Sequence, residues 1–187
     1  MLGTRVQGGA VAEDLQDSAA VRARMLAGGG KPALARPESV AGKTSMEIMQ
    51  AMLAGELPSP HIAETLNFAL IAVEPGNATF QSRPQLKHYN PLGTVHGGGY
   101  ATLLDSAVGC AVHILMTAGR SYTTAELSVN IVRAASHETG PLPAIGKVIH
   151  CGKQLARAEG RIVGPEGKLY AHATTTTCLV FELPGWG

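Results

Sequence analysis

The sequence predicts an α+β domain in which an antiparallel sheet of five to six strands wraps around one long central helix. An almost wholly apolar segment over residues 96–118 starts with glycines and is long enough for a helix of about 35 Å. Residues 121–134 alternate between apolar and polar side chains, which is the pattern of a half-buried strand. Further strand candidates are joined by short turns, so they are expected to be antiparallel neighbours.

The predicted domain covers residues 45–187. Residues 1–44 are rich in Gly, Ala, Arg and Pro and show no sustained periodicity, so we expect a mobile N-terminal tail. The domain begins with a short amphipathic helix that has Ser45 as its candidate N-cap and Gly55 as its end.

Strands are predicted on both sides of the central helix. Before it, residues 66–73 and 77–86 are separated by a Glu-Pro-Gly turn, and Pro84 indicates a strand end or an edge. The alternating strand after the helix is expected to place Ala125, Leu127, Val129 and Ile131 on one face and Tyr122, Thr124, Glu126, Ser128 and Asn130 on the other. Three more strands complete the predicted sheet, at residues 142–151, 154–163 and 168–182.

The composition of the chain argues against several classes of function. Charged residues make up 16% of the chain against a usual figure of about 25%, so we expect another copy of the chain to cover much of its surface. A formal net charge of +1, with acidic and basic residues mixed, lacks the basic footprint of a nucleic-acid-binding protein. No stretch has the pattern of a signal peptide or a membrane span, so no membrane partner is expected.

The spacing of cysteines and histidines indicates neither a disulfide framework nor a metal site. The three cysteines form no CxxC motif, which favours free thiols in a reducing cytoplasm. The seven histidines show no HExxH or comparable spacing, and no Walker or Rossmann glycine loop is present. We therefore expect a cytoplasmic protein without a metal or a redox cofactor.

Asp105 is the one formally charged side chain between Lys87 and Arg120, and it lies inside the apolar helix. An ionised group in apolar surroundings is costly unless it is paired, so Asp105 is a functional candidate. The alternative is a buried Asp that bonds a neighbouring strand. Ala101 and Gly109 lie one helical turn to either side of it on the same face, and we expect them to leave room for a substrate groove.

Gly97, Gly98 and Gly99 open the same helix, where backbone N–H groups lack intrahelical partners. Without Cβ atoms they allow close approach of a ligand, and the helix dipole favours a carbonyl oxygen that gains negative charge. A tight loop with close backbone packing is the alternative. Because Gly97 and Asp105 are about 12 Å apart along one helix, a single reacting carbonyl group can reach both only if they come from different subunits.

An ordered set of motifs in this region resembles a known family. Residues 90–109 read NPLGTVHGGGYATLLDSAVG, and a TxEL strand follows. This combination resembles the hotdog-fold acyl-CoA thioesterases of the phenylacetic-acid-degradation (PaaI-like) type, over a stretch from about Ile62 to Val180. The resemblance implies a hotdog fold, hydrolysis of an acyl-CoA to free acid and coenzyme A, and a homodimer or dimer of dimers (a homotetramer) with active sites at the subunit interface.

The resemblance also implies roles for individual residues. Asp105 matches the family's carboxylate, which acts as nucleophile or general base, and Gly97 matches the backbone donor from the partner chain that polarises the thioester carbonyl. Asn90 matches a side chain that positions water or the thioester. His96 stands where the family has a helix-start residue near the acyl group, and Thr124 where relatives often carry a hydroxyl that faces the site.

Coenzyme A is expected as part of the substrate, and no separate cofactor is expected. Gly98 is expected to help bind the substrate, and Lys153 and Arg157 on the later strands are candidates for contacts to coenzyme A. Glu126 is expected to be a solvated strand residue, with a second carboxylate near the site as the alternative. The acyl group stays open among aryl, arylacetyl and medium-chain acids. Two other functions also stay open, a hotdog hydratase or dehydratase and a non-catalytic acyl-CoA-binding sensor.

Overall fold

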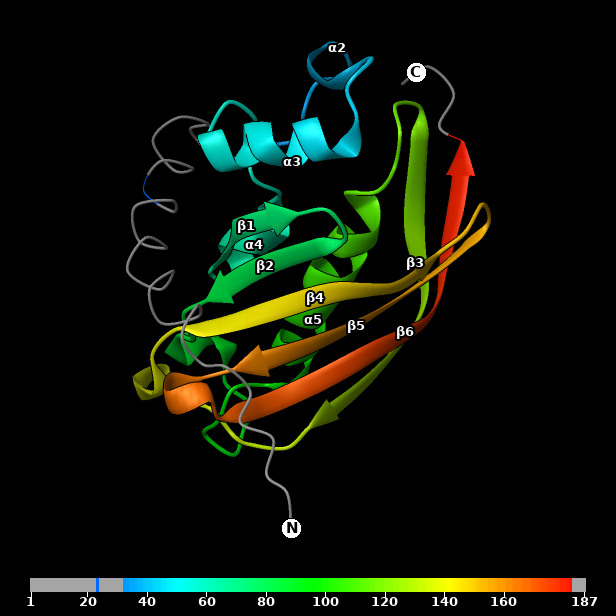
Figure 1. Ribbon diagram of the computed structural model, residues 1–187. Helices are drawn as coiled ribbons and strands as arrows, with labels where there is room; N and C mark the ends of the chain where they lie inside the picture. Colours follow the sequence, from blue (N-terminus) through cyan, green and yellow to red (C-terminus); the bar gives the residue numbers. More distant parts are fainter. Residues whose placement is uncertain (1–22, 24–31, 183–187) are drawn as a thin grey trace.

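The structure is a computed structural model that describes residue 23 and residues 32–182 of the 187-residue chain. Within these residues, six strands form one antiparallel sheet in the order β1-β2-β4-β5-β6-β3, which curves around helix α5 (Figure 1). The strands are β1 (Phe68–Glu74), β2 (Asn77–Ser82), β3 (Arg120–Ile131), β4 (Leu142–Cys151), β5 (Leu155–Val163) and β6 (Leu169–Glu182). The predicted α+β architecture, a sheet around one central helix, is confirmed.

The helices and turns complete the described chain. The α-helices are α2 (Pro37–Val40), α3 (Ser45–Ala54), α4 (His61–Thr65) and α5 (Gly97–His113). Three single-turn 3₁₀ helices are η1 (Leu86–His88), η2 (His137–Thr139) and η3 (Pro165–Gly167). In the described part of the chain, no helix has both the length and the apolar character needed to cross a membrane.

Helix α5 is shorter than the segment predicted over residues 96–118. It ends at His113, and the chain continues into a tight turn in which the Met116 N–H donates to the His113 carbonyl at 2.8 Å. Ile114 and Met116 are nevertheless buried. The apolar run therefore continues past the helix because this turn is also covered, and hydrophobicity alone does not separate a buried turn from a helix.

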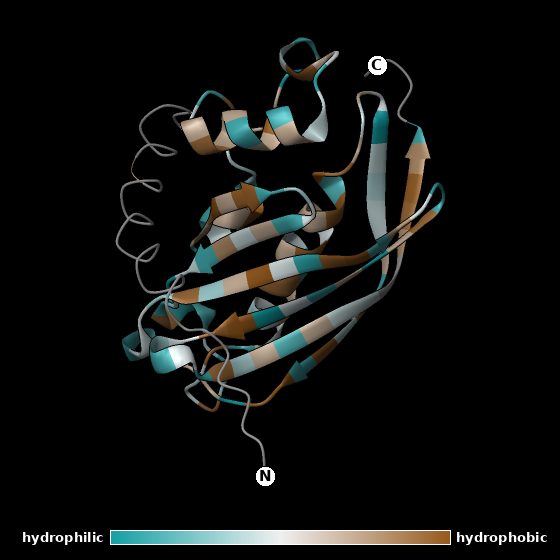
Figure 2. Ribbon diagram, in the orientation of Figure 1, coloured by the Kyte–Doolittle hydropathy of each residue, from teal (hydrophilic) through white to brown (hydrophobic). Residues whose placement is uncertain are grey.

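The centre of the core is the contact between α5 and the middle strands. Five residues of α5 have no exposed surface: Leu104, Ala107, Val108, Ala111 and Val112. A Cβ atom added to Gly146 of β4 would lie 2.1 Å from the Ala107 carbonyl oxygen, so the backbones of helix and strand touch there. Figure 2 shows hydrophobic residues recurring along α5 and along the strands that cross it. Small residues at this crossing allow the sheet to wrap closely around the helix.

The N-terminal helices correct two predictions. The N-cap of α3 is Thr44 and not Ser45: the Thr44 hydroxyl accepts from the Glu47 N–H, and the Glu47 carboxylate accepts from the Thr44 N–H at 2.7 Å. Val40 of α2 is buried in a cluster with Ala51 and Leu57. The packed chain therefore begins before the predicted boundary at residue 45. Most of the predicted tail, residues 1–22 and 24–31, lies outside the described residues.

Strand β3 departs from the predicted alternation. Leu127 and Val129 are half-buried as predicted, but Ala125 is exposed and Ile131 is 46% exposed. The pairing of β3 with β6 shifts register on both sides of Glu126, so an extra residue interrupts the alternation. Before this bulge, the inward side chains are the even-numbered ones, Tyr122 and Thr124. The strand predicted over residues 77–86 likewise ends early, at Ser82.

Candidate active site

The N-terminus of α5 presents one free backbone donor. His96 is the N-cap, and its Nδ1 atom accepts a hydrogen bond of 2.8 Å from the Gly98 N–H. The Gly99 N–H donates to the His96 carbonyl at 2.9 Å. Among the described residues, no group accepts a hydrogen bond from the Gly97 N–H. Gly97 therefore has the unused donor that an anion-stabilising site needs, whereas the donor of Gly98, a predicted substrate contact, is already used.

Asn90 shapes the loop that leads into this helix. Its Nδ2 atom donates to the Thr94 hydroxyl at 3.0 Å, and its Oδ1 atom accepts from the Leu92 N–H at 2.9 Å and the Thr94 N–H at 3.2 Å. Both ends of the amide are thus used inside the turn. The predicted role of Asn90 toward water or a thioester stays a prediction.

Asp105 opens onto a groove between α5 and β3. The groove has a volume of ≈ 400 Å³ and is lined by Ala101, Thr102, Asp105, Thr124, Ala125, Glu126 and Leu127. The structure thus brings two predicted site residues, Asp105 and Thr124, to one concave surface. Glu126 also lines this surface. It is exposed to solvent, as the sequence favoured, and it is also the second carboxylate near the site that was the alternative.

The carboxylate of Asp105 is incompletely satisfied. Its Oδ1 atom is buried, and no group in the described residues donates a hydrogen bond to it. A buried polar atom without a partner is costly, and such atoms call for an explanation by function or by a missing partner. The alternative prediction was a buried Asp that bonds a neighbouring strand. This oxygen accepts no such bond within the described residues.

Gly97 and Asp105 do not share a cavity within one chain. Both lie on the same continuous helix, which keeps them about 12 Å apart. The groove at Asp105 is lined by α5 residues beginning at Ala101 and does not include Gly97. A Cβ atom on Gly97 would lie 3.2 Å from the Cδ1 atom of Ile131, at the far end of β3. Within one chain, the two groups therefore belong to different ends of the α5–β3 contact.

The room predicted beside Gly109 is filled. A Cβ atom on Gly109 would lie 2.6 Å from the hydroxyl oxygen of Tyr122. The Tyr122 ring also lies 5.4 Å from the His113 ring, centroid to centroid. Only the Ala101 half of the predicted small-residue clearing belongs to the groove. Sequence reasoning assigned Tyr122 to the polar face of the strand and missed this contact because the bulge near residue 125 could not be foreseen.

Burial determines the protonation of several groups near the groove. It raises the pKa of Cys110 to about 12, so this thiol is protonated near neutral pH and is a poor nucleophile. It also raises the pKa of Tyr122 well above the ordinary value, with the neighbouring Cys110 and Asp105 adding to the shift. Burial lowers the pKa of His113, which favours the neutral imidazole. Neither Cys110 nor Tyr122 therefore supplies an anion to the site near neutral pH.

The two predicted coenzyme A contacts lie away from the groove. Lys153 is in the turn between β4 and β5, where its carbonyl accepts from the Arg120 guanidinium at 2.6 Å. Arg157 is exposed on β5, opposite His150 of β4. Neither residue lines the groove at Asp105 in the single chain. Their contacts to coenzyme A stay a prediction.

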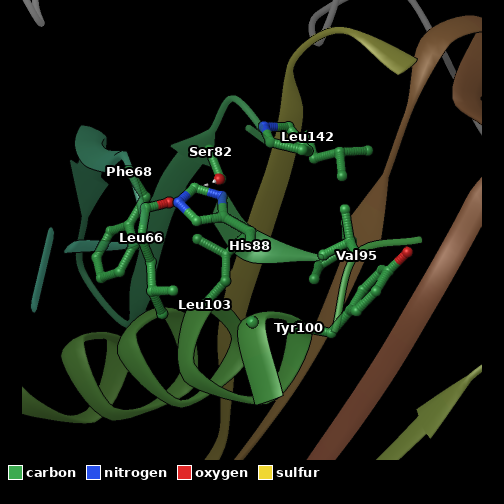
Figure 3. A pocket seen from close by; sticks show the side chains of 11 residues that line it. Leu66, Phe68, Ser82, His88, Val95, Tyr100, Leu103 and Leu142 are labelled. Atoms are coloured by element: carbon green, nitrogen blue, oxygen red, sulfur yellow. Dashed lines mark hydrogen bonds between the residues drawn. The ribbon is translucent and has the colours of Figure 1, made fainter. Parts of the chain in front are cut away.

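A second, much smaller cavity surrounds His88 (Figure 3). Its volume of ≈ 20 Å³ holds about one water molecule. His88 Nδ1 accepts from the Gln85 N–H at 3.2 Å, so Nε2 carries the proton and donates to the Thr65 carbonyl at 3.1 Å. Burial lowers the pKa of His88. This histidine is therefore a neutral structural group, and the described residues contain no cluster of side chains suited to a metal ion.

Comparisons with known proteins bear on this site. Residues 92–171 match the family model described as the thioesterase superfamily. A 1,4-dihydroxy-2-naphthoyl-CoA hydrolase from Listeria monocytogenes is 29% identical over 112 residues, which cover 58% of this chain and 86% of that protein.

Solved structures with the same fold include two related to phenylacetic acid degradation. A degradation-related protein from Ralstonia eutropha is 29% identical, with a TM-score of 0.63, covering 70% of this chain and 98% of its own. The PaaI protein from the phenylacetic acid degradation operon of E. coli has a TM-score of 0.61 over 76% of this chain and 95% of its own, and at 21% identity it supports the fold alone.

Proposed function

We propose that the chain is a hotdog-fold member of the thioesterase superfamily, the family model that its residues 92–171 match, and that it is an acyl-CoA thioesterase that releases free acid and coenzyme A. The observation that carries the proposal is the buried, unpartnered Oδ1 atom of Asp105 at the edge of an open groove. A carboxylate poised there has two possible uses on a thioester. Both are consistent with the same surroundings.

In the first use, Asp105 is the nucleophile. A carboxylate oxygen bonds to the thioester carbonyl carbon, the carbon–sulfur bond breaks, and the thiolate of coenzyme A leaves and takes up a proton. Water then hydrolyses the mixed anhydride and restores the carboxylate. In the second use, Asp105 is a general base that removes a proton from water as the water attacks the same carbon. The carbon–sulfur bond then breaks, and the leaving thiolate takes up a proton. Thr124, across the groove from Asp105, would orient the carboxylate or the water in either case.

The developing negative charge on the carbonyl oxygen needs a donor, and the Gly97 N–H is free to serve. Because this donor is about 12 Å from Asp105 within one chain, we assign it to a second subunit. Strand β3 lines the groove and is an edge strand of the sheet, so no strand of residues 32–182 pairs with its outer side. A homodimer, or a dimer of dimers, in which a second copy lies beside β3 would bring a helix N-terminus to the groove.

The substrate is an acyl-CoA, with an aryl, arylacetyl or medium-chain acyl group. The Listeria relative is a hydrolase of an aryl acyl-CoA, which favours the aryl class. We keep Lys153 and Arg157, outside the groove of the single chain, as the candidates for contacts to the phosphates of coenzyme A, and His96 would hold the helix start in shape through its bond to Gly98. The reaction needs no metal or redox cofactor, because a carboxylate, a water and a backbone donor supply the hydrolytic groups.

Thiol release from a panel of aryl-CoA and fatty acyl-CoA substrates tests the proposal. Asp105→Asn keeps the shape of the side chain and removes its charge, and we expect turnover to fall at least about 100-fold. Glu159→Gln makes the matched change on an exposed residue of β5 and should leave turnover within about twofold.

Three other outcomes would contradict the proposal. Equal turnover by wild type and Asp105→Asn would show that Asp105 is neither the nucleophile nor the general base. Hydration or dehydration of the acyl chain without free thiol would indicate a hydratase, and binding without any turnover would indicate a sensor.

A further inference from the structure

We propose that Tyr122 closes one end of the groove at Asp105 and so limits the length of the acyl group that the site accepts. The inference rests on the proposed thioesterase function and specifies its substrate class: compact acyl groups are preferred over long, extended chains. Tyr122 is assigned here as a residue that determines specificity. It has no part in the bond-making steps.

The groove is open on one side of Asp105 and blocked on the other. On the N-terminal side, Ala101 and Thr102 line the open surface. On the C-terminal side, the next position on the same helical face is Gly109, which has no side chain to fill the space. A groove could therefore continue past Gly109, and Tyr122 is the residue that prevents it.

Tyr122 occupies this space completely. A Cβ atom on Gly109 would lie 2.6 Å from the Tyr122 hydroxyl oxygen, 2.8 Å from its Cε2 atom and 3.0 Å from its Cζ atom. Carbon atoms in van der Waals contact are about 3.5–4.0 Å apart, so not even one methylene group fits between ring and helix. Since Tyr122 and Thr124 are both inward residues of β3 before the bulge, the ring stands directly beyond the groove wall.

The Tyr122 ring is packed against neighbouring side chains that hold it in place. On one side it packs against the His113 ring. It also packs against a buried apolar cluster that includes Val108, Val112, Met116 and Val180. Shortening Tyr122 would therefore vacate the volume of its ring and leave a space walled by this cluster, which is the kind of surface that binds an alkyl chain.

The expected consequence is a change in chain-length preference. Each methylene group that becomes buried contributes about fourfold to kcat/KM. In a series of acyl groups from acetyl to dodecanoyl, wild type should lose activity once the acyl chain is long enough to reach Tyr122. Tyr122→Ala should prefer longer acyl chains than wild type. For this variant, kcat/KM should be about 15-fold higher for an acyl chain two methylene groups longer than the wild-type optimum, if both groups become buried.

The experiment measures kcat/KM for saturated acyl-CoAs from acetyl to dodecanoyl with wild type, Tyr122→Ala and Tyr122→Phe. Tyr122→Phe keeps the ring and should keep the wild-type profile. Tyr170→Ala is a matched control, because it truncates another tyrosine, on β6, that packs over Gly164 away from the groove. It should lower stability without moving the length optimum.

Binding separates this inference from the proposed function. S-alkyl-CoA thioethers of increasing length are not hydrolysed, and calorimetry reports their affinity whether or not the protein turns over. A shift to longer alkyl groups in Tyr122→Ala supports the inference even if no thioester is hydrolysed. An unchanged length profile in a folded Tyr122→Ala protein, checked by near-UV circular dichroism, would overturn it. If Tyr122→Ala does not fold, Tyr122→Leu gives the same test with a smaller opening.

Discussion

The two sides of helix α5 meet the sheet in different ways. Toward β4 and β5, the helix backbone touches strand backbone at Gly146, and Leu104 and Ala107 have no exposed surface. Toward β3, the same helix leaves an open groove, and the Oδ1 atom of Asp105 has no hydrogen-bond partner in the described residues. One side shows close packing, and the other shows an unsatisfied charged group beside free space. The contrast locates the site on the β3 side.

Glycine shows the difference most clearly, because it serves opposite purposes on the two sides. Gly146 has no Cβ so that two backbones can touch, whereas Gly109 has none so that an aromatic ring can close a groove. Gly97 leaves a helix start accessible to a ligand. A glycine therefore contributes to stability, specificity or catalysis according to the group that lies against it.

The largest expected effect is on the closely packed side. Gly146→Ala would place a Cβ atom 2.1 Å from the Ala107 carbonyl oxygen. Relieving this clash would require strand β4 or helix α5 to shift. We expect a loss of about 3 kcal/mol or more in the free energy of unfolding, measured by urea denaturation. Gly160→Ala should cost less, because its nearest neighbour at 2.6 Å is a methyl group of the Val108 side chain and not a backbone atom. Equal costs would mean that the backbone contact at Gly146 is not tight.

The second prediction concerns the helix start. Gly97 is the first residue of α5, where proline is tolerated, so Gly97→Pro removes the free N–H while keeping the helix. We expect kcat for thioester hydrolysis to fall about 100-fold, the effect of one lost oxyanion donor. Gly97→Ala keeps the N–H, and its Cβ meets only the end of the exposed Ile131 side chain. Comparable losses in both variants would show that shape, and not the donor, matters there.

The third prediction is an energetic coupling across the blocked end of the groove. Gly109→Ala forces a Cβ into the Tyr122 ring and should cost about 1–3 kcal/mol of stability. In a Tyr122→Ala background the same change should cost nearly nothing, because the colliding ring is gone. A double-mutant cycle by thermal or urea unfolding measures the coupling. Additive costs would show that Tyr122 and Gly109 do not touch.

The smallest expected effect is the pH dependence from His88. Because burial lowers its folded-state pKa, the unfolded chain binds more protons below about pH 6.5. Its contribution to stability is complete above that pH and declines as pH falls toward the lowered folded-state value. Urea denaturation across this range should show wild type weakening with acid more than His88→Gln. A steeper acid loss in the variant would contradict the neutral assignment of His88.

The sequence was sufficient for the elements whose signal is local. The glycine-started apolar run located α5, and the short turns predicted an antiparallel sheet around it. Asp105 was a candidate because it interrupts an apolar helix, and the resemblance to hotdog thioesterases implied that Thr124 faces the same site; the groove contains both.

What the sequence could not supply depends on contacts between distant residues. A register shift near Ala125 changes which side chains of β3 face the helix, and no local pattern signals it. The contact of Tyr122 with Gly109 follows from that shift. The amide of Asn90 is used by Leu92 and Thr94 in a turn whose closure only the fold determines.

The central claim is that Asp105 of one subunit works with the Gly97 N–H of another. Asp105→Asn and Gly97→Pro should each be nearly inactive alone. When the two are unfolded together and reassembled, half of the dimers are mixed and one of the two sites in each mixed dimer is intact, so about a quarter of wild-type thiol release should return. Activity that stays at the level of the separate variants, while differently tagged subunits co-purify as mixed dimers, would contradict the account.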